Sequence, residues 1–185
     1  MKQGCKTAES AGLWYGTGKV LFPVVAVFLF SGCVSRFNVI TGMSELLDDR
    51  GVYPSIEVDI AALTDKEVDE IKSLGVEGYF SPGNTIRRRI EPFTVFFSNE
   101  DTTPATLLFD DIPWKTWMRK KPKTLFIIAS LPPAEEEADE RMLFLPMGRT
   151  VLGVRTKYIR IESNKIVEVY ERPLDPRVQG ASKEE

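Results

Sequence analysis

Residues 157–170 read KYIRIESNKIVEVY and form the clearest pattern in the chain. Apolar and polar residues alternate on both sides of the turn residues Ser163, Asn164 and Lys165, which is typical of two paired strands with one buried face. This stretch therefore predicts an antiparallel hairpin, and it places the C-terminal part of the chain in a β-sheet.

Further strands are expected before this hairpin. Strict alternation over residues 55–60 predicts a half-buried strand with Ile56, Val58 and Ile60 pointing inward, and the apolar run 125–129 predicts a strand buried on both faces. About seven strands are expected, against two short helices, and they do not alternate with helices as in a parallel α/β sheet. We therefore expect a mainly β protein, an antiparallel β-sandwich with two short helices.

The two helices are predicted from their end signals. Thr64 and Glu67 have the spacing of a capping box, and Gly75 is a natural stop for the helix that the box begins. Pro113 can open the second helix, which carries Trp114 and Trp117 on one side. Both helices are short, so the strands are expected to dominate the fold.

The N-terminal region has the order of an export signal. Lys19 precedes the apolar run 20–30, which the small residues Ser31 and Gly32 separate from Cys33. The run is too short to span a bilayer, which takes about 20 apolar residues. A cysteine after Ser-Gly resembles the lipobox of bacterial lipoproteins, in which the signal is cut before the cysteine and the cysteine is acylated, with palmitate among its fatty acids. The alternative is a plain secretory signal or an N-terminal membrane anchor.

This pattern predicts the organisation of the whole chain. We expect lipidation at Cys33, which would leave a mature chain of one domain. The expected segments are a lipoprotein signal peptide, a tether, a β-sandwich domain and a disordered tail, over residues 1–32, 33–54, 55–172 and 173–185.

Composition removes most classes of catalytic site. The chain has no histidine, which excludes a Ser-His-Asp triad and a histidine-ligated zinc, and its two cysteines are Cys5 and Cys33. The net charge of −3 argues against bulk binding of nucleic acid. The acidic run 135–140, interrupted only by Ala138, lacks the spacing of a calcium loop. We expect no catalytic residue, no cofactor and no metal, so the chain is predicted not to be an enzyme.

The basic clusters of the chain have two interpretations. One basic cluster is residues 87–89, and a second surrounds Trp114 and Trp117 and consists of Lys115, residues 119–121 and Lys123. Both fit anionic lipid head groups or a nucleic acid backbone. The simpler interpretation is that cations offset a helix dipole while the tryptophans pack on a sheet. The acidic residues on strand 55–60, Glu57 and Asp59, are interpreted as surface charge.

The order of elements resembles one family. A lipobox at Cys33, a strand at 56–60, a buried strand at 125–129 and an alternating hairpin ending at 159–169 are together similar to TssJ, the small outer-membrane lipoprotein of type VI secretion systems. The resemblance implies a transthyretin-like β-sandwich without enzymatic activity. It also implies a role in holding TssM, the large inner-membrane component of these systems.

We therefore expect a lipid-anchored scaffold or adaptor on the outer membrane, facing the periplasm, with a protein partner that is an inner-membrane secretion component. The competing hypothesis is a tethered carrier of a sugar or lipid, with a cleft beside Trp114 and Trp117. A third is an envelope protein with no specific partner. The predicted partner-binding residues lie in a turn and in the acidic run; they are Tyr79, Phe80, Asn84, Glu135, Glu136 and Glu137.

Overall fold

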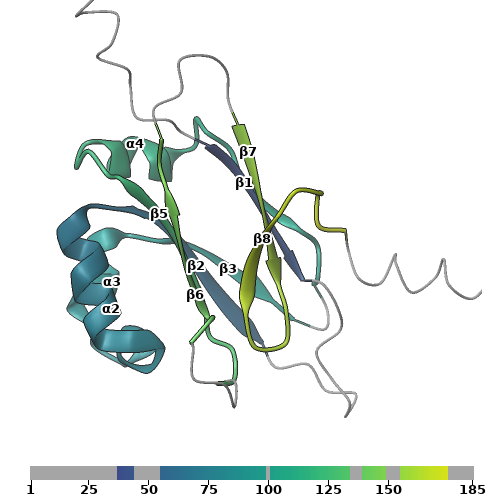
Figure 1. Ribbon diagram of the computed structural model, residues 1–185, viewed down its shortest axis with the longest axis horizontal. Helices are drawn as coiled ribbons and strands as arrows, with labels where there is room; N and C mark the ends of the chain where they lie inside the picture. Colours follow the sequence, from purple (N-terminus) through teal and green to yellow (C-terminus); the bar gives the residue numbers. More distant parts are fainter. Residues whose placement is uncertain (1–36, 44–54, 99–100, 134–138, 149–154, 175–185) are drawn as a thin grey trace, which may run out of the picture. The chain divides into compact units, whose positions relative to one another are not determined.

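The strands of this protein form two sheets of four strands each (Figure 1). The computed structural model describes residues 37–43, 55–98, 101–133, 139–148 and 155–174. In chain order the elements are β1 (Phe37–Met43), β2 (Ile56–Leu63), α2 (Asp65–Phe80), α3 (Thr85–Ile90), β3 (Phe93–Phe97), β4 (Ala105–Leu107), α4 (Ile112–Met118), β5 (Thr124–Ala129), β6 (Met142–Pro146), β7 (Arg155–Ile161) and β8 (Ile166–Val169).

The predicted fold class is confirmed. One sheet has the strand order β4-β1-β7-β8 and the other β3-β2-β5-β6, so the molecule is a mainly β sandwich with short helices. Two details differ from the expectation. The pair β1 and β7 is parallel, while every other described pair is antiparallel. A third described helix, α3, lies between α2 and β3.

The predicted hairpin is β7 and β8. These strands pair from Tyr158 opposite Val169 to Ile161 opposite Ile166, and the amide of Glu162 donates to the carbonyl of Lys165 at 2.9 Å across the turn. Ile159, Ile161 and Ile166 are buried, as the alternation requires.

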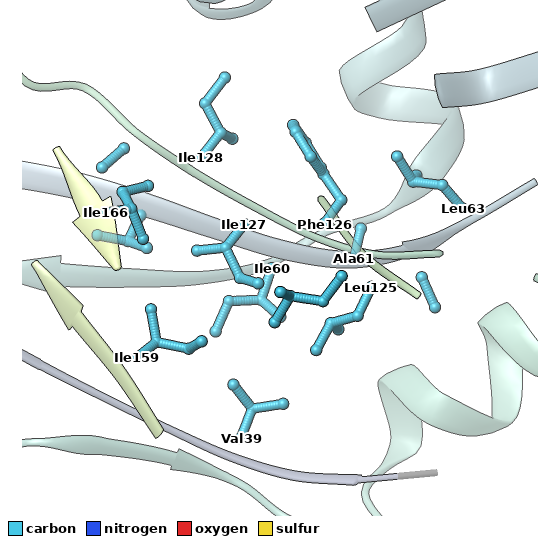
Figure 2. Packing of buried hydrophobic residues seen from close by; sticks show 14 of the residues in the cluster. Val39, Ile60, Ala61, Leu63, Leu125, Phe126, Ile127, Ile128, Ile159 and Ile166 are labelled. Carbon is cyan, nitrogen blue, oxygen red and sulfur yellow. The ribbon is translucent and has the colours of Figure 1, made fainter. Parts of the chain in front are cut away.

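The core lies between the two sheets (Figure 2). Val39 and Ile159 of one sheet face Ile60, Leu125 and Ile127 of the other. Successive side chains of a strand point to opposite faces, so the neighbours of these residues in β2 and β5 lie on the outer face of that sheet. That outer face is also covered, because α2 contacts both β2 and β5 and α3 contacts β2. The prediction that residues 125–129 form a strand buried on both faces is therefore confirmed for β5.

The predicted tether over 33–54 is wrong for residues 37–43, which form the strand β1. β1 is a central strand, paired with β4 on one side and β7 on the other, and Phe37, Val39 and Met43 belong to the core. Its polar residues, such as the buried Thr41, hide the alternation that would have identified it. The remaining residues of the predicted tether lie outside the described ranges.

The predicted disordered tail is also wrong at its first residue. Pro173 is buried, and a Cβ added to Gly42 of β1 would lie 2.7 Å from the Cβ of Pro173. Only glycine admits so close an approach, so the segment after β8 packs directly on the β1 backbone. Residues 175–185 lie outside the described ranges.

The predicted capping box is confirmed at the start of α2. The Glu67 carboxylate accepts hydrogen bonds of 2.8 Å from both the amide and the hydroxyl of Thr64. The predicted stop at Gly75 is half right, because Gly75 leaves helical geometry at φ 67° but a further helical segment continues to Phe80. This extra turn carries the side chains that build the candidate site.

Candidate partner-binding site

The connection between α2 and α3 is held in shape by Asn84. Its side-chain amide donates to the carbonyls of Gly78 at 3.0 Å and Tyr79 at 2.8 Å, and its side-chain oxygen accepts from the amide of Ile86 at 2.8 Å. Asn84 thus caps α3 while it binds the end of α2. Gly83 takes a positive φ of 84°, which allows the tight turn between the two helices.

An open hollow of about 420 Å³ lies over this connection. Phe80 supplies an aromatic wall, and two guanidinium groups, those of Arg87 and Arg88, supply positive charge. The lining residues are Phe80, Ser81, Pro82, Gly83, Asn84, Arg87 and Arg88. An apolar wall with an adjacent cation is the composition that favours a protein interface, in which aromatic residues and arginine provide most of the binding energy.

Arg87 is tied to the outer face of the sheet below it. Its Nε donates to Oδ2 of Asp59 at 2.7 Å and its Nη2 donates to Oδ1 at 3.2 Å, while Nη2 also pairs with Glu57. The planar fork of a guanidinium matches a carboxylate in this two-point geometry. Because two carboxylates compensate one cation, Arg87 fixes α3 on β2 and has little charge left for a ligand.

Asp59 is the centre of this network. It is fully buried, and it also accepts hydrogen bonds from the hydroxyls of Thr94 at 2.6 Å and Tyr79 at 2.8 Å. A buried carboxylate is tolerated only when it is paired and its oxygens are satisfied, and these donors do both. The interpretation of Glu57 and Asp59 as surface charge is therefore wrong, because the helices cover that face of the sheet.

The network shifts two pKa values. Burial, together with the charge and hydrogen bond of Asp59, raises the pKa of Tyr79. Burial acts to lower the pKa of Arg87, but its hydrogen bonds to Asp59 and Glu57 outweigh burial and hold that pKa above its usual range. Tyr79 therefore stays neutral and Arg87 stays charged at physiological pH. The Arg87 guanidinium also lies 5.2 Å from the centre of the Phe80 ring, a cation–π contact that orients the aromatic wall.

Arg88 has a different environment from Arg87. It is exposed, and its described hydrogen bond, from Nη2 to the carbonyl of Gly83, is long at 3.2 Å. No described carboxylate lies within ion-pair distance of it, whereas the next residue, Arg89, pairs with Glu70. Arg88 is thus the cation of this hollow that is best placed to bind an acidic group of a partner.

The predicted binding residues lie in different places in the structure. Phe80 and Asn84 line the hollow, but the side chain of Asn84 makes its hydrogen bonds within the turn. Tyr79 is wrong as a surface residue, since its side chain is fully buried against Phe126 and Asp59. The predicted lipidation site, Cys33, and the acidic residues Glu135, Glu136 and Glu137 lie outside the described residues, so these predictions are untested.

The base of the acidic segment is nevertheless described. Arg141 is almost fully buried, and its guanidinium donates to Asp139, to Glu77 of α2 and to the carbonyl of Leu131. Leu131 and Asp139 flank residues 134–138, so one side chain joins the two ends of that segment. The hydrogen bonds from Arg141 lower the pKa of Asp139.

The two tryptophans of α4 pack as the simpler interpretation predicted. Both are fully buried, the Trp114 ring lies 6.5 Å from that of Phe37, and Trp117 donates its indole N–H to the carbonyl of Glu91. A second, smaller hollow of about 170 Å³ lies at Met43, Arg160 and Leu174, so neither described hollow is lined by a tryptophan. The two described hollows therefore give no support to the predicted cleft beside these tryptophans.

The described residues include no group of three or more acidic or cysteine side chains placed to hold a metal ion. Nor does any helix within the described ranges have the length and apolar character needed to cross a membrane.

Comparison with known proteins finds similarity in structure but not in sequence. No family model matches the sequence, and no curated protein is similar to it in sequence. A solved chain described as part of a type VI membrane complex matches with a TM-score of 0.51 and 12% identity, over 74% of this chain and 98% of that one. At this identity the likeness concerns the fold alone.

Two further solved chains match with lower TM-scores. A chain of a structure described as the T6SS protein TssM C-terminal domain (869–1107) from EAEC has a TM-score of 0.48 and 14% identity, over 73% of this chain and 99% of that one. The Lip protein of Serratia marcescens, described as a membrane-bound component of the type VI secretion system, has 0.47 and 10%, over 74% and 98%. The chain of the type VI membrane complex, at a TM-score of 0.51, agrees at the level of the fold with the resemblance to a type VI secretion family that the sequence indicated.

Proposed function

We propose that this protein is a lipid-anchored adaptor of a type VI secretion membrane complex. In this proposal residues 1–32 are a lipoprotein signal peptide, Cys33 carries the lipid, and the sandwich faces the periplasm from the outer membrane. The protein acts by binding and has no catalytic role. The observation that carries the proposal is the fold, which is similar to that of a chain from a type VI membrane complex, together with the lipobox-like sequence before Cys33.

The binding surface in this proposal is the hollow over the α2–α3 connection. Phe80 offers an apolar contact and Arg88 a cation without a described ion pair, while Asp59, Arg87 and Asn84 hold the backbone that presents them. A preformed surface loses little conformational entropy on binding, which favours a stable contact. The acidic residues 135–137 are a second proposed docking element. The proposed partner is an inner-membrane component of the secretion system.

The competing carrier hypothesis has less support. It required a cleft beside Trp114 and Trp117, and both indole rings are buried in the core. Ligand pockets enclose most of a small ligand, whereas the hollow over α2 and α3 is open to solvent. A protein surface is the better occupant for a hollow of this kind.

The test is an affinity capture from detergent-solubilised envelopes, with bound proteins identified by mass spectrometry. The parent chain is expected to recover a large inner-membrane secretion protein, and Cys33→Ala is expected to recover less because it loses the anchor. Recovery of no secretion component by the parent would overturn the proposed function.

A charge reversal tests the surface itself. Arg88→Glu is expected to lower recovery about tenfold or more, the effect of removing an interface residue that dominates binding. The matched control is Lys165→Glu, which reverses a partly exposed cation on the β7–β8 turn. Equal losses for the two variants would show that overall charge, rather than this hollow, governs capture. For the acidic element, replacing residues 135–137 with serine should weaken capture while the unfolding transition is unchanged.

A further inference from the structure

The loop between β4 and α4 lies at the start of β1. Leu107 of β4 is in register with Val39 of β1, and the amide of Phe109 donates to the side-chain oxygen of Asn38 at 3.0 Å. Trp114 of α4 packs against Phe37, the first residue of β1. In Figure 1, α4 and the beginnings of β1 and β7 accordingly share one end of the sandwich. The position of this loop is therefore tied to the point where the chain enters the domain.

Three large apolar side chains are exposed here, two in this loop and one at the first residue of α4. Leu108 is 46% exposed, Phe109 38% and Ile112 77%. The loop is not loose, because Asp111 and Leu108 exchange two hydrogen bonds, one from the Leu108 amide to the Asp111 carboxylate at 2.7 Å and one from the Asp111 amide to the Leu108 carbonyl at 3.1 Å. A folded turn thus holds neighbouring apolar groups in water, and such clusters mark contact surfaces.

The outer face of α4 continues this surface with positive charge. Ile112, Lys115 and Arg119 are spaced by three and four residues, so they follow one face of the helix, opposite the buried Trp114 and Trp117. Lys115 and Arg119 are exposed, and no carboxylate among the described residues lies within ion-pair distance of either. The loop also holds an exposed carboxylate, Asp110, which the two cations outweigh. We name the set Leu108, Phe109, Ile112, Lys115 and Arg119 the 108–119 surface.

Chain length relates this surface to Cys33. Cys33 precedes Phe37 by four residues, because β1 begins far earlier than the tether prediction allowed. An extended chain advances about 3.3–3.6 Å per residue, so a lipid on Cys33 holds the bilayer within about 14 Å of the start of β1. The end of the sandwich that carries the 108–119 surface is then the end nearest the membrane.

We propose that the 108–119 surface lies against a bilayer containing anionic phospholipid. Leu108, Phe109 and Ile112 enter the boundary between head groups and acyl chains, and Lys115 and Arg119 bind lipid phosphates. Apolar side chains flanked by cations are the composition of interfacial membrane contacts, and a lipid chain with a basic patch anchors more firmly than the chain alone. The inference rests on the lipid anchor of the proposed function. Its consequence is a fixed orientation, with the opposite end of the sandwich presented to the periplasm.

The test is fluorescence of full-chain protein reconstituted in vesicles of phosphatidylethanolamine and phosphatidylglycerol, with and without brominated acyl chains. Phe109→Trp adds a reporter within the surface, and Ile112→Trp is a second reporter at its most exposed residue. Brominated lipid is expected to reduce the added fluorescence by a factor on the order of two, as for a side chain at the acyl boundary. The matched control is Phe96→Trp, an exposed aromatic at the opposite end, where β3 pairs with the start of β2.

The outcomes test the membrane contact of the 108–119 surface separately from the lipid anchor at Cys33. Mass spectrometry of the same samples reports acylation of Cys33. Quenching of the two reporters but not of the control supports the proposal, even if Cys33 is unmodified, in which case the anchor of the proposed function fails. No quenching on an acylated chain, or equal quenching at Phe96, overturns the membrane surface and leaves the anchor in place. Lys115→Ser with Arg119→Ser is expected to reduce quenching in phosphatidylglycerol vesicles, while Lys165→Ser is not.

Discussion

The hydroxyl of Tyr79 donates a hydrogen bond of 2.8 Å to the carboxylate of Asp59, and both side chains are fully buried. This contact joins the last turn of α2 to the outer face of the sheet. Arg87 reaches the same carboxylate from α3, so one aspartate positions both helices. The candidate binding hollow depends on that arrangement, because its lining residues lie between Tyr79 and Arg88.

Removing the Tyr79 hydroxyl should destabilise the fold. Tyr79→Phe leaves the buried Asp59 with one donor fewer, which is expected to cost about 1–3 kcal/mol of the free energy of unfolding. Urea denaturation of the parent and the variant measures this difference. Tyr170→Phe is the control, since Tyr170 is 99% exposed and should change the midpoint little. A Tyr79→Phe variant as stable as the parent would mean that water replaces the lost donor.

The same residue predicts a loss of stability in alkali. Because the pKa of Tyr79 is raised in the folded protein, its contribution is fully present below the pKa of an unfolded tyrosine, which is about 10. It is lost as the pH rises above that value, because the unfolded tyrosine ionises and the folded one does not. The stability difference between the parent and Tyr79→Phe should therefore narrow between about pH 9 and about pH 11, around the unfolded pKa. A constant difference across this range would contradict the shift.

The contribution of Asp139 to stability is expected to have the opposite pH dependence and to be lost in acid. Its pKa is lowered by hydrogen bonds from Arg141, so its contribution is present above the unfolded pKa and disappears as the pH falls through the folded value. Asp139→Asn should thus destabilise the protein at pH 7 and have a smaller effect below about pH 4. Thermal unfolding at several pH values checks this, with the exposed Asp110→Asn as the control. An effect that is independent of pH would assign the loss to packing instead.

Gly42 predicts a steric effect at the centre of its sheet. A Cβ at this position would meet Pro173 at 2.7 Å and Pro104 at 3.3 Å, so Gly42→Ala must move one of these segments. We expect a loss of about 1–3 kcal/mol in the free energy of unfolding, typical of overpacking. Gly148→Ala is the matched control, because nothing lies within 4 Å of its added Cβ. Similar effects for both variants would show that chain entropy dominates.

Sequence patterns predicted those elements whose structure is determined by residues close together in the chain. The alternation of β7 and β8 and the Thr64–Glu67 capping box are signals of this kind, and both are confirmed. Strand β1 escaped prediction because its burial comes from pairing with β4 and β7, which are distant in the chain. No local window contains that information.

The turn that lines the candidate hollow was predicted from the sequence, but the hydrogen-bond network beneath it was not. The turn at residues 79–84 was identified, yet Asp59 was assigned to the surface because alternation marks one face of a strand as polar without saying what covers it. One helix that covers it, α3, has a good cap residue in Asn84, but it is only six residues long. The run Arg87 to Arg89 suggested a patch of equal cations, and the fold gives each of the three a different partner.

The parallel pairing of β1 with β7 has a consequence for how the domain forms. Phe37 lies opposite Arg155, so the earliest strand of the domain closes its sheet only with one of the last. Contacts that join such distant segments are slow to form, since the intervening loop must close first. A chain crossing a membrane from its N-terminus would therefore emerge with β1 lacking its β7 partner until nearly all of its length had passed. Truncation before Arg155 should yield a product that stays sensitive to protease, however long it is left to fold.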